Sequence, residues 1–204
     1  MLVYNSLKPC VAIAYDSSTF NDLKIFLQEE SVTLSRVTPE EFFDGYSPAY
    51  QYINLINKDM QLRKKISTAL DMHNLDRFAY VHELSRLSGF LVTPGSLIYP
   101  NVTPYAGSVF GKDILIHAGT TIAHTVKIDD GCYFGGSIHI GGGCQIGKFC
   151  FIGSSVTVYE NVNISHDVTI GFGSLVRKNI NSPGTYAATS RGFKKLPIHK
   201  EKIN

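Results

Sequence analysis

The sequence predicts an α/β domain over residues 1–88, a parallel β-solenoid over residues 89–180 and a tail over residues 181–204. Three observations support this prediction. Apolar strand patterns alternate with helix patterns up to about residue 88, aliphatic residues recur every six positions from residue 98 onward, and 204 residues suffice for one large or two small domains. The composition, 44% hydrophobic and 18% charged, is that of a globular protein.

The elements expected in the first domain alternate between strand and helix. The expected strands are 10–14, 31–37, 52–56 and 78–81, and the expected helices begin at Ser17 or Ser18, at Thr38-Pro39-Glu40-Glu41 and at Lys58. Ser and Thr side chains accept hydrogen bonds from the first helical N–H groups, and Pro suits the first helical position. Alternation of this kind predicts a small parallel sheet.

The second domain is predicted by its period of six. Of the fourteen positions reached in steps of six from Ile98 to Val176, thirteen are Ile, Val or Phe, whereas chance predicts about six. A row of small or β-branched residues stands two positions earlier. Glycine follows the aliphatic row at positions 111, 135, 141, 147, 153 and 171, where we expect tight corners with positive φ. Three short strands therefore make one 18-residue coil.

Composition excludes several classes of protein. A net charge of +2 argues against a nucleic-acid-binding protein with a basic surface. With no run of 18 apolar residues and no signal-peptide pattern, we expect a cytoplasmic protein without a membrane span. Cys132, Cys144 and Cys150 lie on the small inward row, so we expect core thiols. The histidines lack the spacing of a zinc site, and no metal is expected.

Several segments of the second half resemble a known family. They are residues 122–129 with His124, the Gly-rich stretch 170–178, Pro183-Gly184 and, before the solenoid, His82. They resemble the nucleotide-sugar N-acyltransferases of the bacillosamine and perosamine acetyltransferase type, which include sialic-acid O-acetyltransferase-like proteins. The resemblance covers nearly the whole chain. It implies a Rossmann-like domain, a left-handed parallel β-helix of hexapeptide repeats, and a homotrimer with active sites between neighbouring β-helices.

The resemblance also implies roles for individual residues. His124 would be the catalytic base, and His117 and Tyr133 would contact the sugar substrate. The acetyl-CoA co-substrate would be bound by the residues that match the family's groove and its phosphate end: Gly142, Ser154, Phe172, Arg177 and Lys178. Spacing adds that His124 points outward at a corner. Its neighbours one coil away, Ala106 and Gly142, are small enough to leave room for a pantetheine arm.

The sequence departs from the family at three places. Thr125 stands where the family carries an acid beside the base, so Asp113, Asp129 or Asp130 would replace that acid, or nothing does. Tyr133 stands where the family has a second histidine. The first loop, residues 14–19, has no glycine, and Ser35-Arg36 replaces the acid after the second strand. A nucleotide would then bind through Ser17, Ser18 or the helix N-terminus, or would not bind.

Together these features predict an acetyl-CoA-dependent N-acetyltransferase. Its acceptor would be the amino group of a nucleotide-linked 4-amino-4,6-dideoxy sugar, used for O-antigen or another surface glycan. One alternative is a sugar O-acetyltransferase of the same fold. Another is a non-catalytic trimeric scaffold, which Thr125 and the glycine-free loop favour.

Overall fold

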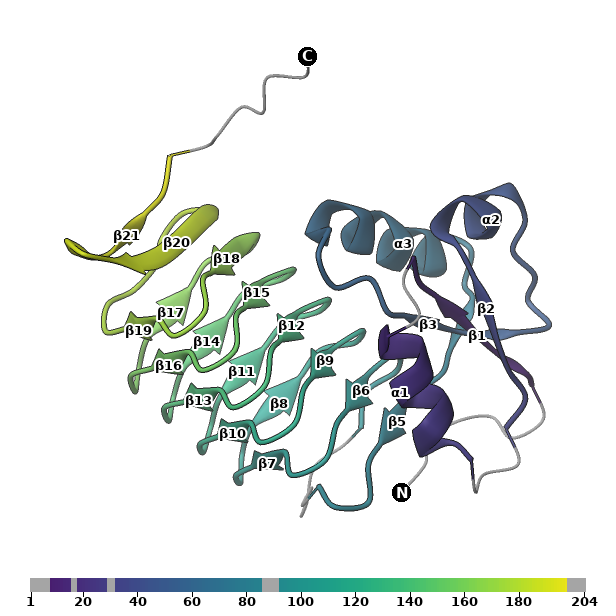
Figure 1. The fold of residues 1–204 in the computed structure, drawn as a ribbon, viewed down its shortest axis with the longest axis horizontal. Coiled ribbons are helices and arrows are strands. Elements are labelled where there is room, and N and C mark those ends of the chain that lie inside the picture. The colour runs from purple at the N-terminus through teal and green to yellow at the C-terminus, as the bar shows by residue number, and fades with distance from the viewer. Residues whose placement is uncertain (1–7, 16–17, 29–31, 86–91, 198–204) are drawn as a thin grey trace.

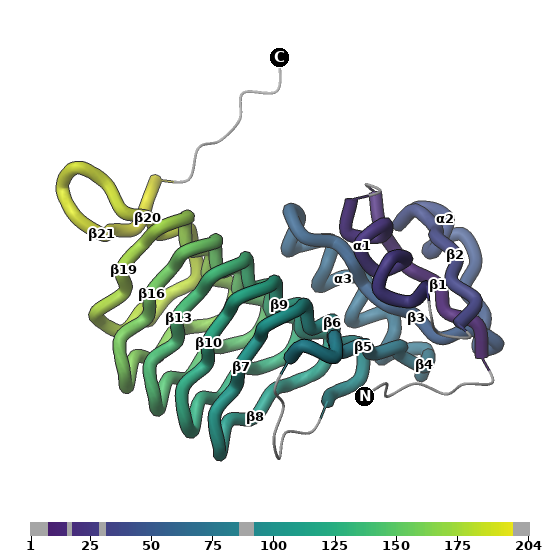
Figure 2. The backbone as a smooth tube through the Cα atoms, turned by 60° about the horizontal axis from the view of Figure 1, so that its bottom comes forward, coloured from purple at the N-terminus to yellow at the C-terminus, as the bar shows by residue number. Residues whose placement is uncertain are grey.

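The computed structural model describes residues 8–15, 18–28, 32–85 and 92–197. A small α/β domain lies at the N-terminal end of a long parallel β-helix (Figure 1). The coils of the β-helix stack as regular turns, and the C-terminal strands lie at the far end (Figure 2). Among the described residues, no helix combines the length and the apolar character needed to cross a membrane.

The first domain is built on a four-stranded sheet in the order β2-β1-β3-β4, with every pair parallel. Its elements are β1 (Cys10–Ile13), α1 (Ser18–Phe26), β2 (Leu34–Val37), α2 (Pro39–Asp44), β3 (Gln51–Asn54), α3 (Met60–Met72) and β4 (Asp76–Arg77). The predicted alternation and parallel sheet are confirmed, while the Rossmann-like character remains a prediction. Helix α2 begins at the expected Thr38, whose side chain accepts from the Glu41 N–H in a capping box.

Within the strand expected at 78–81, only Tyr80–Val81 forms a strand, and it joins the β-helix instead of the first sheet. Asp76 and Arg77 complete the first sheet as β4, whereas β5 (Tyr80–Val81) pairs with β6 (Leu97–Ile98) of the β-helix. The Tyr80 N–H donates to the Ser96 carbonyl at 2.8 Å. An apolar run does not reveal which sheet will receive it, because both partners bury it equally well. The predicted boundary at 88/89 lies outside the described residues.

The β-helix consists of short strands in three parallel ladders. They are β6, β7 (Thr103–Pro104), β8 (Val109–Phe110), β9 (Leu115–Ile116), β10 (Thr121–Ile122), β11 (Lys127–Ile128), β12 (Tyr133–Phe134), β13 (His139–Ile140), β14 (Gln145–Ile146), β15 (Phe151–Ile152), β16 (Thr157–Val158), β17 (Asn163–Ile164), β18 (Val168–Ile170) and β19 (Leu175–Val176). Every rung pairs residues 18 apart; Ile122, for example, lies between Pro104 and Ile140. This register confirms the predicted coil.

The inward rows form the core of the β-helix. The aliphatic row is buried at nearly every position, and Cys132, Cys144 and Cys150 are fully buried free thiols. They are core residues, as predicted. Burial raises the pKa of the Cys132 and Cys144 thiols, so both stay protonated and pack as small apolar groups.

Three corners separate the three ladders, and we name each after one of its residues. The His124 corner comprises residues 105–107, 123–125, 141–143, 159–161 and 177–179. The Phe172 corner comprises 99–101, 117–119, 135–137, 153–155 and 171–173, and the Asp167 corner comprises 111–113, 129–131, 147–149 and 165–167. Except at Asn179, the third residue of each corner segment has left-handed backbone, with φ of 57° at Thr125 and 52° at Asp167.

The expected positive φ at the glycines that follow the aliphatic row is wrong. Positive φ falls two residues later, and these glycines are required by the close approach of the next coil. A Cβ atom at Gly141 would lie 2.5 Å from the Glu160 nitrogen, and one at Gly147 would lie 2.7 Å from the His166 nitrogen. Both distances are shorter than the van der Waals contact distance between a carbon and a nitrogen atom, so no side chain fits at these glycines.

A buried arginine joins the two domains. Arg63, in α3, has no exposed surface, and its guanidinium donates to the carbonyls of Asn54, Ile56, Asp113 and Gly131 at 2.6–2.9 Å. The first two carbonyls belong to the α/β domain and the last two to the β-helix. Burial lowers the pKa of Arg63, which Asp113 opposes. Its hydrogen bonds therefore fix α3 against the coils, beside which it lies in Figure 1.

The last strands continue one ladder beyond the coils. β20 (Gly184–Thr189) pairs in parallel with β18, and β21 (Gly192–Lys195) pairs with β20 in an antiparallel hairpin. Part of the predicted tail therefore extends the sheet that begins with β5.

Candidate active site

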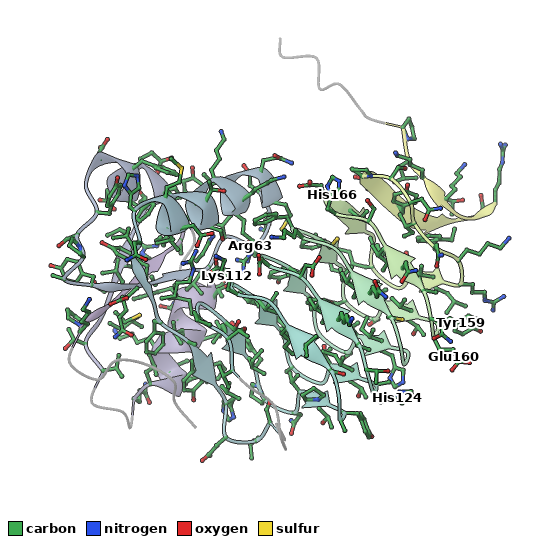
Figure 3. The ribbon with its side chains drawn as sticks, turned by 180° about the vertical axis from the view of Figure 1, so that it is seen from behind. Arg63, Lys112, His124, Tyr159, Glu160 and His166 are labelled. Carbon is green, nitrogen blue, oxygen red and sulfur yellow. The ribbon has the colours of Figure 1, made fainter. Side chains whose placement is uncertain are left out.

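The site predicted around His124 lies on one edge of the β-helix. Thr125 donates its N–H to the Ala106 carbonyl, Gly143 donates to the His124 carbonyl at 3.0 Å, and Asn161 donates to Gly142 at 2.8 Å. His124, Gly142, Glu160 and Lys178 therefore follow one another at intervals of one coil. Figure 3 shows His124, Glu160 and Tyr159 along this edge.

The exposed imidazole of His124 is oriented by its neighbour in sequence. Its Nδ1 lies 3.1 Å from Thr125 Oγ1, and the Thr125 hydroxyl donates to the His124 carbonyl at 2.7 Å. Since that hydroxyl has only one proton, it accepts a hydrogen bond from Nδ1–H. The lone pair is then on Nε2, the nitrogen that faces away from Thr125.

The aspartates considered as replacements for the missing acid lie elsewhere. Asp113, Asp129 and Asp130 all belong to the Asp167 corner. Asp113 forms an ion pair with Arg77 at 2.9 Å, and Asp130 forms one with Lys148 at 2.9 Å. Thr125 itself is therefore the group that orients the His124 imidazole.

Gly142 determines where the imidazole can lie. A Cβ atom at this position would stand 2.7 Å from both Cε1 and Nε2 of His124, so the ring occupies the space that a side chain would need. Gly142 is buried as a result. Its N–H donates to no backbone carbonyl among the described residues. The predicted contact between this N–H and the cofactor remains a prediction.

The two predicted sugar contacts, His117 and Tyr133, lie together. Tyr133 Oη is 2.8 Å from His117 Nε2, and the His117 ring lies on Tyr99 with 4.2 Å between centroids. The Tyr99 hydroxyl reaches Asp22 of α1 at 3.1 Å, so this cluster is at the junction of the domains. Burial lowers the pKa of His117, against an opposing effect of Asp22, and the imidazole is neutral at pH 7.

The remaining predicted residues are divided between two corners. Ser154 and Phe172 follow one another on the Phe172 corner, where Gly173 donates to the Ser154 carbonyl at 2.9 Å. One chain therefore does not bring them together with Gly142 and His124. Ser18 is the first residue of α1, and Ser17 lies outside the described residues.

Arg177 and Lys178 complete the His124 corner at its C-terminal end. The Arg177 guanidinium lies 5.3 Å from the Tyr159 ring centroid. Both cations line a hollow of about 550 Å³, and residues of the β20–β21 hairpin, among them Tyr186, Phe193, Lys194 and Lys195, line it as well. Sequence reasoning missed the two lysines because only the hairpin brings them here. It also missed Glu160, although the distance of 36 residues from His124, two coils, was available as a signal.

Comparisons with known proteins identify the fold. No family model and no curated protein matches the sequence. Among solved structures, the acetyltransferase domain of PglB from Neisseria gonorrhoeae matches with a TM-score of 0.76 at 17% identity, covering 93% of this chain and all of that one. A histidine variant of GDP-perosamine N-acetyltransferase from Caulobacter crescentus, in complex with CoA and GDP-perosamine, matches with 0.77 at 18% identity, covering 97% and 99%.

The fold is that of these acetyltransferases. WeeI from Acinetobacter baumannii matches over a similar length, 93% of this chain and 99% of its own, with a TM-score of 0.62 at 13% identity. The predicted β-helix after an α/β domain is thereby confirmed. The His124 corner has an oriented imidazole at one end and two cations at the other. This arrangement suits a long ligand whose anionic end binds the cations and whose reactive end lies beside the imidazole.

Proposed function

We propose that the protein is an acetyl-CoA-dependent N-acetyltransferase that acts on a nucleotide-linked 4-amino-4,6-dideoxy sugar, with His124 as general base. One observation carries the proposal: a single corner presents an oriented imidazole and, three coils away, Arg177 and Lys178. The likeness to acetyltransferase structures that hold CoA, acetyl-CoA and GDP-perosamine supports the same substrate classes. Such an enzyme would work in the cytoplasm, in surface-glycan biosynthesis.

The spacing along the corner suits the donor. Three coils separate His124 from Lys178, which is about 14 Å at the usual distance between neighbouring strands. An extended pantetheine arm spans a comparable length. With the CoA phosphates on Arg177 and Lys178, the thioester would reach the His124 imidazole. Lys194 and Lys195 add positive charge to the phosphate end.

The reaction needs one proton acceptor and one oxyanion donor. The neutral amine attacks the thioester carbonyl, a C–N bond forms, and the oxygen becomes anionic. Nε2 of His124 accepts the amine proton, and the Gly142 N–H is the proposed donor to the oxyanion. The intermediate then expels the CoA thiolate with cleavage of the C–S bond. The thiolate takes the proton from the imidazolium.

The acceptor would be bound at the junction of the domains. His117 and Tyr133 would contact the sugar, and Ser17 and Ser18 would contact the nucleotide. Because the Phe172 corner is a different edge of the prism, we assign Ser154 and Phe172 to the donor bound on a neighbouring copy. A homotrimer with sites between copies satisfies this requirement.

A mass-spectrometric assay tests the proposal. The protein would be mixed with acetyl-CoA and UDP-, dTDP- or GDP-linked 4-amino sugars, with His124→Ala as the paired variant. We expect one acceptor to gain one acetyl group and the variant to lose this activity by about 10²-fold or more. Acetyl-CoA binding without any N-acetylated product would favour O-acetylation. Absence of both binding and product would favour the scaffold.

A further inference from the structure

We propose that Glu160 binds the middle of the pantetheine arm as a hydrogen-bond acceptor, with Tyr159 packing against the same part of the donor. This inference rests on the proposed function, because it presumes that the donor lies along the His124 corner.

The position of Glu160 on the corner is fixed by the backbone register. The Gly142 carbonyl accepts a hydrogen bond from the Asn161 N–H, and Gly142 lies directly beneath the His124 ring, so Glu160 is one coil beyond the ring. Lys178 follows one coil after Glu160. Glu160 therefore stands between the proposed base and the cations, two coils from His124 and one coil from Lys178, with about 5 Å along the axis between neighbouring levels.

The part of the His124 corner between His124 and Glu160 is open to a ligand. Residues 141–143 are all glycine, so apart from the His124 ring no side chain stands between His124 and the pair Tyr159–Glu160. Both members of that pair are exposed, Tyr159 by 45%. The Glu160 carboxylate accepts no hydrogen bond and joins no ion pair within the described ranges.

The chemistry of the donor's middle segment matches these two side chains. Between thioester and phosphates, pantetheine carries two amide N–H groups and a hydroxyl, separated by methylene and methyl groups. An ionised carboxylate is purely an acceptor, and hydrogen bonds to it are stronger than those to neutral groups. The Tyr159 ring offers an apolar face for the methylene groups, with its other contact to Arg177. The Glu160 carboxylate would repel a phosphate group, so the diphosphate of the donor would lie one coil farther along, beside Lys178.

The position of Glu160 along the His124 corner determines which part of the pantetheine arm it would contact. With the thioester beside His124, the amide nearer to sulfur lies at the level of the ring and Gly142. The second amide and the hydroxyl beyond it lie farther toward Lys178. Glu160 is therefore assigned to these more distant donors.

Three acyl donors of decreasing length test the assignment: acetyl-CoA, S-acetylpantetheine and S-acetyl-N-acetylcysteamine. The last lacks the second amide and the hydroxyl. For Glu160→Ala we expect KM to rise about tenfold with the two longer donors, the effect of losing one charge-assisted hydrogen bond. With the shortest donor we expect no change. Glu160→Gln should lie between the wild type and Glu160→Ala.

Two comparison variants define the outcomes. Asp129→Asn removes an exposed acid from the Asp167 corner and should change KM for none of the donors. Arg177→Ala should affect acetyl-CoA alone. Equal effects of Glu160→Ala on all three donors, or no effect on any, overturn the inference while wild-type activity upholds the proposed function. If the wild type transfers acetyl from no donor, the proposed function fails and the inference with it. Matching melting temperatures confirm that each variant is folded.

Discussion

At the residue scale, the proposed base, His124, is oriented by the hydroxyl group of Thr125 and not by a carboxylate. Thr125 fixes the imidazole through Nδ1 and is itself held by the His124 carbonyl. A hydroxyl sets the tautomer but adds no negative charge to stabilise an imidazolium. This arrangement suits acyl transfer to an amine, which needs less help in losing its proton than a hydroxyl does.

Substitution of Thr125 by valine tests this role. Valine keeps the β-branched shape but cannot accept from Nδ1–H, so we expect kcat to fall about tenfold while the fold is unchanged. Thr125→Ser retains the hydroxyl and should keep most of the activity. Equal kcat values for the valine variant and the wild type would show that the hydrogen bond does not orient the base.

Gly142→Ala separates the position of the imidazole from the stability of the coil. The added Cβ would stand 2.7 Å from the ring, which must move, whereas the backbone and its N–H are retained. We expect kcat to fall by about 10²-fold, as displacements of about 1 Å do, without a change in melting temperature. Gly45→Ala is the control, since no atom lies within 4 Å of the Cβ that it would add. Full activity in Gly142→Ala would contradict the placement of the base.

At the scale of elements, the strands of the β-helix could be predicted from sequence, but the reason for its glycines could not. The inward positions hold aliphatic side chains on one row and small or β-branched ones on the other, so the period of six can be recognised directly in the sequence. How closely the next coil approaches Gly141 depends on the path of two backbones, which no single segment encodes. The same holds for Tyr80–Val81, whose choice of sheet depends on the docking of the first domain.

The ion pairs between α3 and the Asp167 corner make stability depend on pH. Burial alone would raise the pKa of Asp167, but His166 at 2.7 Å and Lys64 at 3.0 Å outweigh it and lower that pKa. A carboxyl group with a lowered folded-state pKa stabilises the fold above its unfolded pKa, about 3.9, and this contribution is lost as the pH falls through the folded value.

Thermal unfolding of Asp167→Asn between pH 2.5 and 7 tests this linkage. We expect its melting temperature to lie about 2 °C below the wild type at pH 7, because the pair is partly exposed. The difference should shrink below about pH 4. A difference that stays constant down to pH 2.5 would show that the carboxylate charge is not involved.

At the scale of the whole molecule, the proposed donor and acceptor groups lie on different faces of one chain. The His124 corner carries the proposed base, whereas His117 and Tyr133 face the junction with α1. All three residues belong to the same β-helix, so motion between the two domains would not bring them together. We propose that a second copy supplies the missing half.

Mixed assemblies test whether sites are shared between copies. His124→Ala would be co-expressed with the double variant His117→Ala/Tyr133→Phe, each inactive alone. In randomly mixed trimers about a quarter of the interfaces combine two intact halves, and we expect about a quarter of wild-type activity. No recovery from confirmed mixed assemblies would place the complete site within one chain.

The parts of the candidate site were predictable from sequence to different degrees. The coil period places Gly142, Glu160 and Lys178 in line with His124 by arithmetic alone. By contrast, Lys194 and Lys195 reach the same end of the corner through a hairpin, and the carbonyl contacts of Arg63 arise from packing between domains. Contacts that follow a repeat can be predicted, whereas contacts between distant, non-repeating segments need the folded chain.

The 18-residue register limits how insertions and deletions can alter this protein. Six extra residues between Gly143 and Tyr159 would turn every later coil by one third of a revolution and carry Arg177 and Lys178 to another edge. Eighteen extra residues would keep the edge and lengthen the distance from base to cations by one strand spacing, about 4.8 Å. The number of coils therefore sets the distance between the proposed base and the cations. Only insertions or deletions of whole coils would adapt the edge to a longer or shorter thioester.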